Sequence, residues 1–236
     1  MTKSSIETGS DPTPSGPATR GDEPSTSSQR ERRRRILDAT LALAAKGGYE
    51  AVQMRAVAEK AEVAVGTLYR YFPSKVHLLT SALAREFRRL DQRTERSAPP
   101  GDTAQERMKV VVDMITKSMQ SQPNLTEAMT RAFMFADASV ATEVEEVAFY
   151  MDRMIARAMA QGEPDEVQLS IARVISDVWM SNLVSWLTRR STAADVSARL
   201  GMTIDLILGT DDSPRRARLH NAIASGNGDS EAPLDR

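Results

Sequence analysis

The stretch MRAVAEKAEVAVGTLYRYFPSK, residues 54–75, decides the fold of this chain. Two short helical runs, MRAVAEKA and GTLYRYF, are separated by the residues EVAV, which predict a turn. Longer helical patterns come before and after this stretch, so the short pair is braced on both sides. The pattern predicts a helix-turn-helix, in which the second short helix enters the major groove of DNA.

Small and medium apolar residues occupy the positions where the two short helices must cross closely. They are Val57, Ala58, Ala61, Val63 and Leu68. Leu68 and Phe72 are four residues apart, so on a helix they face inward together. This spacing predicts which side of the second short helix faces solvent.

The outward side carries residue types suited to DNA, in a chain that is only 5% aromatic. A tyrosine ring packs on sugar and its hydroxyl reaches a phosphate, and an arginine binds a phosphate or forks onto guanine. Gly66 leaves room for the backbone to approach the duplex. Arg55, at the start of the first short helix, is a second candidate for a base contact. The outward residues are Val65, Thr67, Tyr69, Arg70 and Tyr71.

Lys75 adds an electrostatic argument to the same surface. With Ser74 as the cap, it lies in the first turn of the next helix, where the helix dipole disfavours a cation. A DNA phosphate bound there would accept hydrogen bonds from the helix N-terminus and pair with the lysine. We therefore expect Lys75 to contact the DNA backbone.

Charge is distributed unevenly along the chain. Residues 30–96 carry 15 Lys and Arg against 8 Asp and Glu, whereas the residues from 97 onward carry 14 against 20. A basic segment joined to an acidic one is typical of a nucleic-acid-binding domain with a second domain attached, although scattered charge is the alternative. Arg30 and the arginines at 32–35 either follow the DNA backbone, enter the minor groove or form a solvated helix start.

Composition places the chain among ordinary globular proteins. It has 236 residues, is 41% hydrophobic and contains no cysteine, so it needs no oxidising compartment. No stretch has the length and apolarity of a signal peptide core or of a membrane span. We expect a cytoplasmic protein with no membrane association.

Helical periodicity dominates from residue 29 onward, and strand signals are almost absent. A helix begins with Ser28 and Glu31 as a capping box and ends at Gly47 and Gly48, and a long amphipathic helix follows Ser74. Further helices are expected at about 103–121, 124–136, 139–161, 165–190 and 192–208. The fold class is all α, with a helix-turn-helix domain at 29–75, a helical second domain at 76–210, and disordered tails at 1–28 and 211–236.

The N-terminal half resembles a known family. RRRRILDATLALAAKGGYEAVQMRAVAEKAEVAVGTLYRYFPSKVHLL is similar to the DNA-binding domain of the TetR family of bacterial repressors. The resemblance implies DNA contacts at Arg55, Val65, Gly66, Thr67, Tyr69, Arg70, Tyr71 and Lys75.

Three positions depart from the family pattern. Gln53 and Ala64 stand where hydroxyl caps are usual, which predicts a cost of up to about 1 kcal/mol each. Glu62 stands where the turn usually has glycine, so it must adopt a conformation normally left to glycine.

Methionine is concentrated in the second domain, since ten of the twelve lie after residue 100, as do both tryptophans. These side chains either fill a helical core or line a cavity for a bulky apolar ligand. TEAMTRAFMFADAS and ARVISDVWMSNLVSWLTRR resemble the branch of the TetR family that controls sterol catabolism. This implies an inducer cavity for a steroid-derived ligand or its coenzyme A thioester. The expected wall comprises Met119, Met129, Phe133, Met134, Met151, Met154, Trp179, Asn182 and Trp186; Phe149 and Tyr150 are wall or core.

The last two helices carry apolar stripes that predict a dimer interface, as the family uses. A reader of DNA half-sites needs two-fold symmetry, and two helices from each subunit would form a four-helix interface. The stripes are Val167, Ile171, Val174, Ile175, Val178, Asn182 and Trp186, then Val196, Leu200, Ile204, Ile207 and Leu208.

Other classes of protein are less well supported. The only histidines are His77 and His220, and the sequence has no Gly-rich phosphate loop and no metal-ligand cluster, so no catalytic residue, cofactor or metal is expected. A ligand-independent DNA-packing protein would not need so long an acidic second half. A TetR-type regulator of another hydrophobic ligand, such as a fatty acyl-CoA or a drug, remains the alternative.

Overall fold

The computed structural model describes residues 26–160 and 162–209, and this part of the chain is helical without strands. The all-α prediction is confirmed. The elements are α1 (Thr26–Ala51), α2 (Met54–Lys60), α3 (Val65–Tyr71), α4 (Lys75–Arg96), α5 (Ala104–Gln120), α6 (Pro123–Met134), the 3-10 helix η1 (Ala138–Val140), α7 (Ala141–Met159), α8 (Glu166–Leu187) and α9 (Ala193–Leu208).

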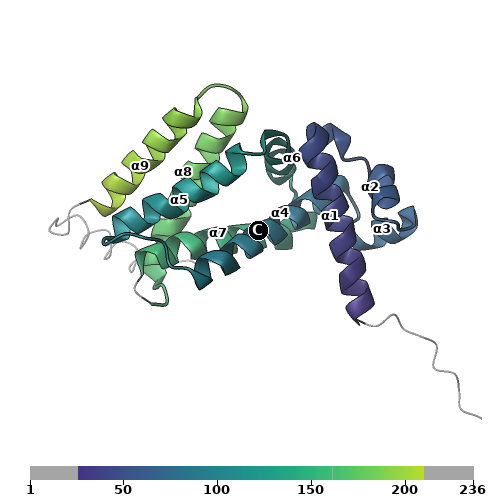
Figure 1. The fold of residues 1–236 in the computed structure, drawn as a ribbon, viewed down its shortest axis with the longest axis horizontal. Helices are drawn as coiled ribbons and strands as arrows, with labels where there is room; N and C mark the ends of the chain where they lie inside the picture. Colours follow the sequence, from purple (N-terminus) through teal and green to yellow (C-terminus); the bar gives the residue numbers. More distant parts are fainter. Residues whose placement is uncertain (1–25, 161, 210–236) are drawn as a thin grey trace, which may run out of the picture.

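Helices α1, α2 and α3 form one end of the molecule, and α4 runs from them into the second domain (Figure 1). Within the helix-turn-helix, Leu68 and Phe72 are 0% and 1% exposed, so the inward side predicted from their spacing is confirmed. Val57, Ala58 and Ala61 are buried with them, and Val63 packs against the same core.

Helix α1 begins earlier than expected and is interrupted where expected. It already includes Thr26, so Ser28 lies inside the helix and the predicted capping box at Ser28 and Glu31 is wrong. Gly47 and Gly48 have non-helical backbone angles, and Gly48 has φ 67°, a left-handed conformation that favours glycine. Residues 26–28, which were predicted to belong to a disordered tail, are part of α1, and the rest of the predicted tails, 1–25 and 211–236, lies outside the described residues.

The turn and caps of the helix-turn-helix match the departures noted in the sequence. Glu62 has φ 54°, so a charged residue occupies the left-handed position of the turn. Gln53 and Ala64 precede α2 and α3 without a side-chain hydrogen bond to the helix. Ser74 caps α4 as predicted, because its hydroxyl accepts a hydrogen bond from the His77 N–H at 3.1 Å.

Helix α4 is fixed in the second domain by a buried carboxylate. Asp91 is 0% exposed and pairs with the guanidinium groups of Arg153 and Arg157, both from α7. Arg157 also pairs with Glu95 at 3.1 Å. Two arginines therefore compensate one buried charge and tie α4 to α7.

Helices α8 and α9 differ from expectation in two respects. Helix α8 ends at Leu187, so Arg189 and Arg190 lie beyond its last turn, and Arg189 has φ 59°. The predicted α9 stripe does not face outward: Val196, Leu200 and Ile204 are buried within the protomer because α9 packs on α5 and α8. The large apolar side chains that these two helices expose are Leu169, Val174, Met202 and Leu206.

Each described helix is too short or too polar to cross a membrane.

Candidate nucleic-acid interface and ligand pocket

The outward face of α3 exposes both apolar and cationic side chains. Val65 and Tyr69 are 37% and 48% exposed, and Arg70 is exposed beside them. Arg70 and Arg55, which is exposed on α2, form no hydrogen bond or ion pair with another described residue. Apolar surface and uncommitted guanidinium groups are thus available on one side of the helix-turn-helix.

Gly66 is not required by the fold. A Cβ atom built at this position meets nothing within 4 Å, and Gly66 lies in the first turn of α3. Glycine inside a helix costs up to about 1 kcal/mol relative to alanine. A residue that the protein itself does not need is consistent with close approach of a partner to the α3 backbone.

Thr67 and Tyr71 are less accessible than the sequence suggested. Both are half-buried, and the Tyr71 ring packs against the core, 6.4 Å from the Phe72 ring centroid. Only part of the Tyr71 side chain can therefore reach a partner.

Lys75 lies at the start of α4, and its side chain turns toward α1. The Lys75 Nζ atom is 3.8 Å from the centroid of the Tyr49 ring, a cation–π contact. Burial lowers the pKa of Lys75, partly offset by the nearby carboxylate of Glu50. The ammonium is held in place by a ring, and no described carboxylate forms an ion pair with it.

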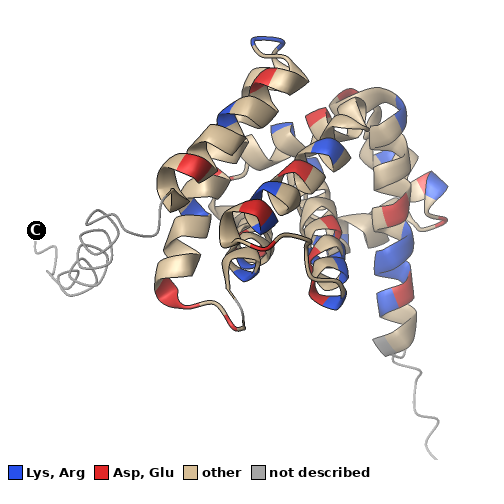
Figure 2. Ribbon diagram, turned by 60° about the vertical axis from the view of Figure 1, so that its left-hand side comes forward, with Lys and Arg blue, Asp and Glu red and all other residues tan. Residues whose placement is uncertain are grey.

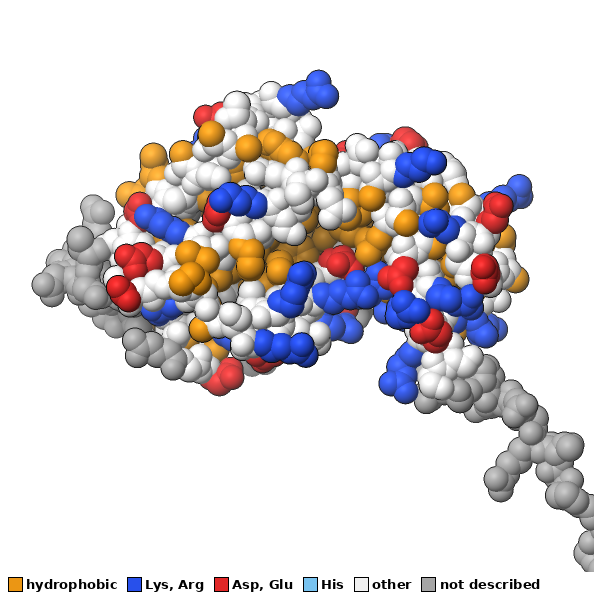
Figure 3. All heavy atoms as spheres, in the orientation of Figure 1, with side chains coloured by type: hydrophobic (Ala, Val, Ile, Leu, Met, Phe, Trp, Pro, Cys, Tyr) orange, Lys and Arg blue, Asp and Glu red, His pale blue; other side chains and the backbone are white. Residues whose placement is uncertain are grey.

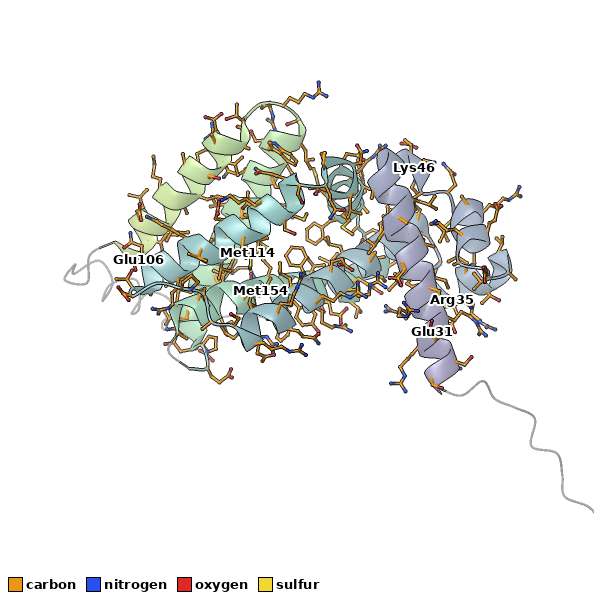
Figure 4. All side chains as sticks on the ribbon, viewed as in Figure 1. Glu31, Arg35, Lys46, Glu106, Met114 and Met154 are labelled. Carbon is orange, nitrogen blue, oxygen red and sulfur yellow. The ribbon has the colours of Figure 1, made fainter. Side chains whose placement is uncertain are left out.

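The arginine run on α1 is partly committed to internal contacts. Arg34 pairs with Glu31 at 2.6 Å and Asp38 at 2.9 Å, and Arg35 lies 3.6 Å from Glu62 in the turn. Arg33 lies over the Phe72 ring at 5.5 Å. Figure 2 shows Lys and Arg along the N-terminal half of α1, and Figure 4 places Glu31 and Arg35 there. The run contributes positive charge near the helix-turn-helix, although Arg34 is neutralised.

A pocket that opens to solvent lies between α4, α5 and α6, and its cavity volume is about 80 Å³. Figure 3 shows a hollow with an apolar floor in this part of the molecule. Its lining residues are Leu83, Glu86, Phe87, Leu90, Arg93, Ile115, Ser118, Met119, Gln122, Leu125, Thr126 and Met129. This cavity is smaller than the roughly 300–1,000 Å³ of sites that bury a small organic ligand, so a bulky ligand requires the surrounding helices to move apart.

The structure brings two of the nine predicted wall residues, Met119 and Met129, into this pocket. Met151, Met154 and Trp179 are at most 4% exposed in the core; Figure 4 labels Met154 on α7.

The other candidates lie away from the pocket lining. Asn182 is buried and donates a hydrogen bond to the Val178 carbonyl oxygen, Phe133 packs against the core, and Met134 is 57% exposed. Trp186 is half-buried beside the α8–α9 turn. Phe149 is 54% exposed, and Tyr150 accepts a hydrogen bond from Arg88 at 2.8 Å.

Sequence reasoning missed the contribution of α4. Leu83, Phe87 and Leu90 line the pocket, and they belong to the long amphipathic helix after Ser74, which was not included among the expected wall residues. Arg93, one turn beyond Leu90, lies at the pocket and has no hydrogen-bonding or ionic partner among the described residues. In the sequence, the available signal for a ligand site was an arginine at the end of the apolar stripe of this helix.

Trp179 lies behind the pocket wall. Its ring packs edge-on against Phe87, with centroids 6.4 Å apart, and its indole N–H donates to Thr116 at 2.9 Å. Phe87 lines the pocket, so a ligand there would act on Trp179 through a single intervening ring.

Comparison with known proteins agrees with this two-part architecture. Residues 36–82 match the family described as bacterial regulatory proteins, tetR family, and residues 101–207 match the tetracyclin repressor-like, C-terminal domain. The HTH-type transcriptional repressor KstR of Rhodococcus jostii (strain RHA1) is 67% identical over 83% of this chain and 90% of that protein. The protein of the same name from Mycobacterium tuberculosis (strain ATCC 25618 / H37Rv) is 64% identical over 78% of this chain and 84% of that protein.

Solved structures show the same fold. A TetR transcriptional regulator from Rhodococcus sp. RHA1 superposes with a TM-score of 0.71 at 29% identity, covering 78% of this chain and 99% of the other. Thermus thermophilus FadR, in complex with lauroyl-CoA, superposes with a TM-score of 0.61 at 18% identity, covering 77% and 97%. The helix-turn-helix, the helical second domain and these matches together show that the chain belongs to the TetR family of bacterial transcriptional regulators.

Proposed function

We propose that this protein is a homodimeric repressor of sterol-catabolism genes that acts in the cytoplasm and is released from operator DNA by a steroid-derived ligand. The observation that carries the proposal is the position of α4. Its N-terminus holds Lys75 beside the helix-turn-helix, and its middle lines the pocket through Leu83 and Phe87. One helix thus connects the DNA-facing surface with the ligand site. The relatives from Rhodococcus jostii and Mycobacterium tuberculosis are named as transcriptional repressors, which supports the same function.

On the DNA side, we propose that Lys75 and Tyr71 contact phosphates and that Arg55 or Arg70 reads a base. Lys75→Ala should weaken binding to all DNA sequences alike and reduce the slope of log affinity against log salt by about 0.9. Replacing the base-reading arginine with alanine should relax selectivity at one operator position, at a cost of about 1–3 kcal/mol. A uniform loss over all operator variants would instead identify that arginine as a phosphate contact.

On the ligand side, the residues that line the pocket suit an apolar body with an anionic end, and the cavity must widen to admit a steroid. Its floor is formed by Leu83, Phe87, Ile115 and Met129, and Arg93 supplies a cation without an internal partner. A coenzyme A thioester of a steroid acid has this combination of properties. Arg93 would then pair with an acidic group of the ligand while the ring system lies among the apolar side chains.

A linkage experiment tests the proposal. Sterol-derived thioesters are titrated into the protein with and without operator DNA, and the fluorescence of Trp179 reports binding because its ring contacts the pocket residue Phe87. If the ligand lowers operator affinity 100-fold, operator must lower ligand affinity equally, a coupling of about 2.7 kcal/mol. Equal ligand affinity with and without operator would reject release by this ligand. Tighter binding and stronger release by lauroyl-CoA would favour a fatty acyl-CoA regulator.

Arg93→Gln separates the anionic end from the apolar body. We expect weaker binding of the thioester and unchanged binding of the uncharged sterol. Arg96→Gln is the matched control, because Arg96 is an exposed arginine on the same helix that does not line the pocket. Equal effects of the two substitutions would show that Arg93 has no direct role.

For the dimer, we propose an interface that includes Val174 of α8 and Met202 and Leu206 of α9, all more than half exposed. Leu206→Glu should shift the protein toward monomers in analytical ultracentrifugation and weaken operator binding with it. Dimers that persist in this variant would place the interface elsewhere.

A further inference from the structure

The Tyr49 ring lies between two cations from different parts of the molecule. Lys75 Nζ, at the start of α4, is 3.8 Å from the ring centroid, and Arg131 Cζ, on α6, is 4.3 Å from it. The Tyr49 N–H also donates a hydrogen bond to Glu127 of α6 at 2.9 Å. This ring therefore joins the end of α1 to α4 and to α6 at once.

Two carboxylates lie beside the same ring, and Arg131 binds both. Arg131 Nη1 is 3.0 Å from Glu50 Oε1 and 3.7 Å from Glu127 Oε1. Both acids act electrostatically on Lys75, since their charges raise its pKa while Arg131 lowers it. Even so, neither carboxylate forms an ion pair with Lys75.

This distribution of partners decides what Lys75 can still bind. An ammonium on a ring face keeps N–H donors for another acceptor, because the ring attracts it as a cation without accepting a conventional hydrogen bond. An ammonium paired with a carboxylate has given up part of its charge and at least one donor, and a phosphate would have to displace that partner.

We propose that Arg131 is a positioning residue for operator binding: by engaging Glu50 and Glu127, it leaves Lys75 on the neutral Tyr49 ring with its ammonium free for a DNA phosphate. This inference rests on the proposed contact between Lys75 and the operator backbone. It assigns a part in DNA binding to a residue of the second domain, two positions after the pocket residue Met129.

Arg131→Met tests the proposal. With the arginine removed, Glu50 and Glu127 are free to pair with Lys75. Operator affinity should therefore fall roughly threefold to tenfold and the salt dependence should become shallower, as when one phosphate contact is partly lost. Lys117→Met is the matched control. It removes one surface cation and one ion pair, with Asp113 at 2.7 Å, from the same domain away from the helix-turn-helix. It should bind operator like the unmodified protein.

A second variant separates positioning from general structural support. Adding Glu50→Gln and Glu127→Gln to Arg131→Met removes both carboxylates that could capture Lys75, so operator affinity and salt slope should recover. A structural defect would not be repaired by removing further partners. Failure to recover, despite a folded protein in thermal denaturation, would overturn the positioning role, as would unchanged affinity of Arg131→Met itself.

Lys75→Ala distinguishes this inference from the function on which it rests. If Lys75→Ala weakens operator binding but Arg131→Met does not, the phosphate contact stands and the role of Arg131 is rejected. If Lys75→Ala has no effect, the proposed phosphate contact fails and the inference fails with it.

Discussion

The helices of the DNA-binding domain and those of the second domain begin in different ways. Helices α5, α8 and α9 each start with a capping box, formed by Thr103 and Glu106, Asp165 and Gln168, and Thr192 and Asp195. Helices α2 and α3 start without a side-chain cap, and no acidic residue lies in the first turn of α1, α2, α3 or α4.

The proposed DNA contacts account for this difference. A carboxylate at a helix N-terminus stabilises the helix, but it would repel DNA phosphates at the ends of α3 and α4, where we propose that the operator binds. In the second domain, α5, α8 and α9 satisfy their own first N–H groups, although α6 and α7 begin without a side-chain cap. In the DNA-binding domain, the first N–H groups of α2 and α3 have no side-chain partner. The DNA-binding domain thus lacks the stability that helix caps would add, at the helix ends that we propose for DNA binding.

The largest loss of stability is expected at the buried ion pairs between α4 and α7. Asp91→Ala leaves Arg153 and Arg157 without their buried partner, so the free energy of unfolding should fall by about 3–5 kcal/mol in chemical denaturation. Asp177→Ala, an exposed acid on α8, is the control and should change stability little. A small loss for Asp91→Ala would mean that solvent enters the α4–α7 contact and compensates the arginines.

Substitutions of two methionines in the second domain distinguish a core position, Met154, from a pocket position, Met119. Met154 is 1% exposed and is not among the pocket residues, so Met154→Ala should cost about 2–5 kcal/mol of unfolding free energy and leave ligand selectivity unchanged. Met119→Ala should cost less stability and alter ligand affinity directly, because Met119 lines the pocket. Calorimetric ligand titration of both variants checks this, and altered selectivity in Met154→Ala would place the ligand deeper than the pocket.

Adding a capping side chain before α3 tests whether the absence of a cap favours DNA binding over stability. Ala64→Ser and Ala64→Asp should each stabilise the DNA-binding domain by about 0.5–2 kcal/mol. Ala64→Asp should also weaken operator binding roughly tenfold through repulsion of phosphate, while Ala64→Ser should affect it less. Thermal denaturation and gel-shift titration measure the two properties, and equal operator affinity in both variants would remove the electrostatic explanation.

The smallest effect concerns the pH dependence of a capping box. Hydrogen bonds from the Thr192 N–H and hydroxyl hold the pKa of Asp195 below its ordinary value. A carboxyl with a lowered pKa in the folded state contributes stability above its unfolded pKa, which is lost as pH falls through the folded value. Asp195→Asn should therefore flatten the loss of melting temperature below about pH 4. An unchanged acid profile would show that this cap opens before the protein unfolds.

The fold could be predicted from sequence because it depends on periodicity and on breakers. Leu68 and Phe72 four residues apart, the glycines at 47 and 48, and Ser74 each act locally, and the structure confirms them. The resemblance to the TetR family is confirmed, and relatives named as transcriptional repressors agree with the expectation that the protein is not an enzyme.

The ligand site could not be predicted equally well, because a wall residue and a core residue look alike in sequence. Met119 and Met154 are both methionines on amphipathic helices, and only the packing of α4, α5 and α6 leaves one of them beside empty space. The prediction that the α9 stripe faces a second subunit was wrong for a related reason. Periodicity shows that Leu200 is buried, but it does not show whether α5 or a second subunit covers it.

The left-handed Glu62 in the turn between α2 and α3 has a consequence for engineering. Its backbone conformation is one that glycine adopts without strain, and its carboxylate lies close to the DNA-facing helices. Glu62→Gly would relieve the strain, remove a charge that repels phosphate and release Arg35 from its ion pair. We therefore expect a single codon change to give tighter operator binding, which is useful where a genetic circuit must stay silent until its signal arrives.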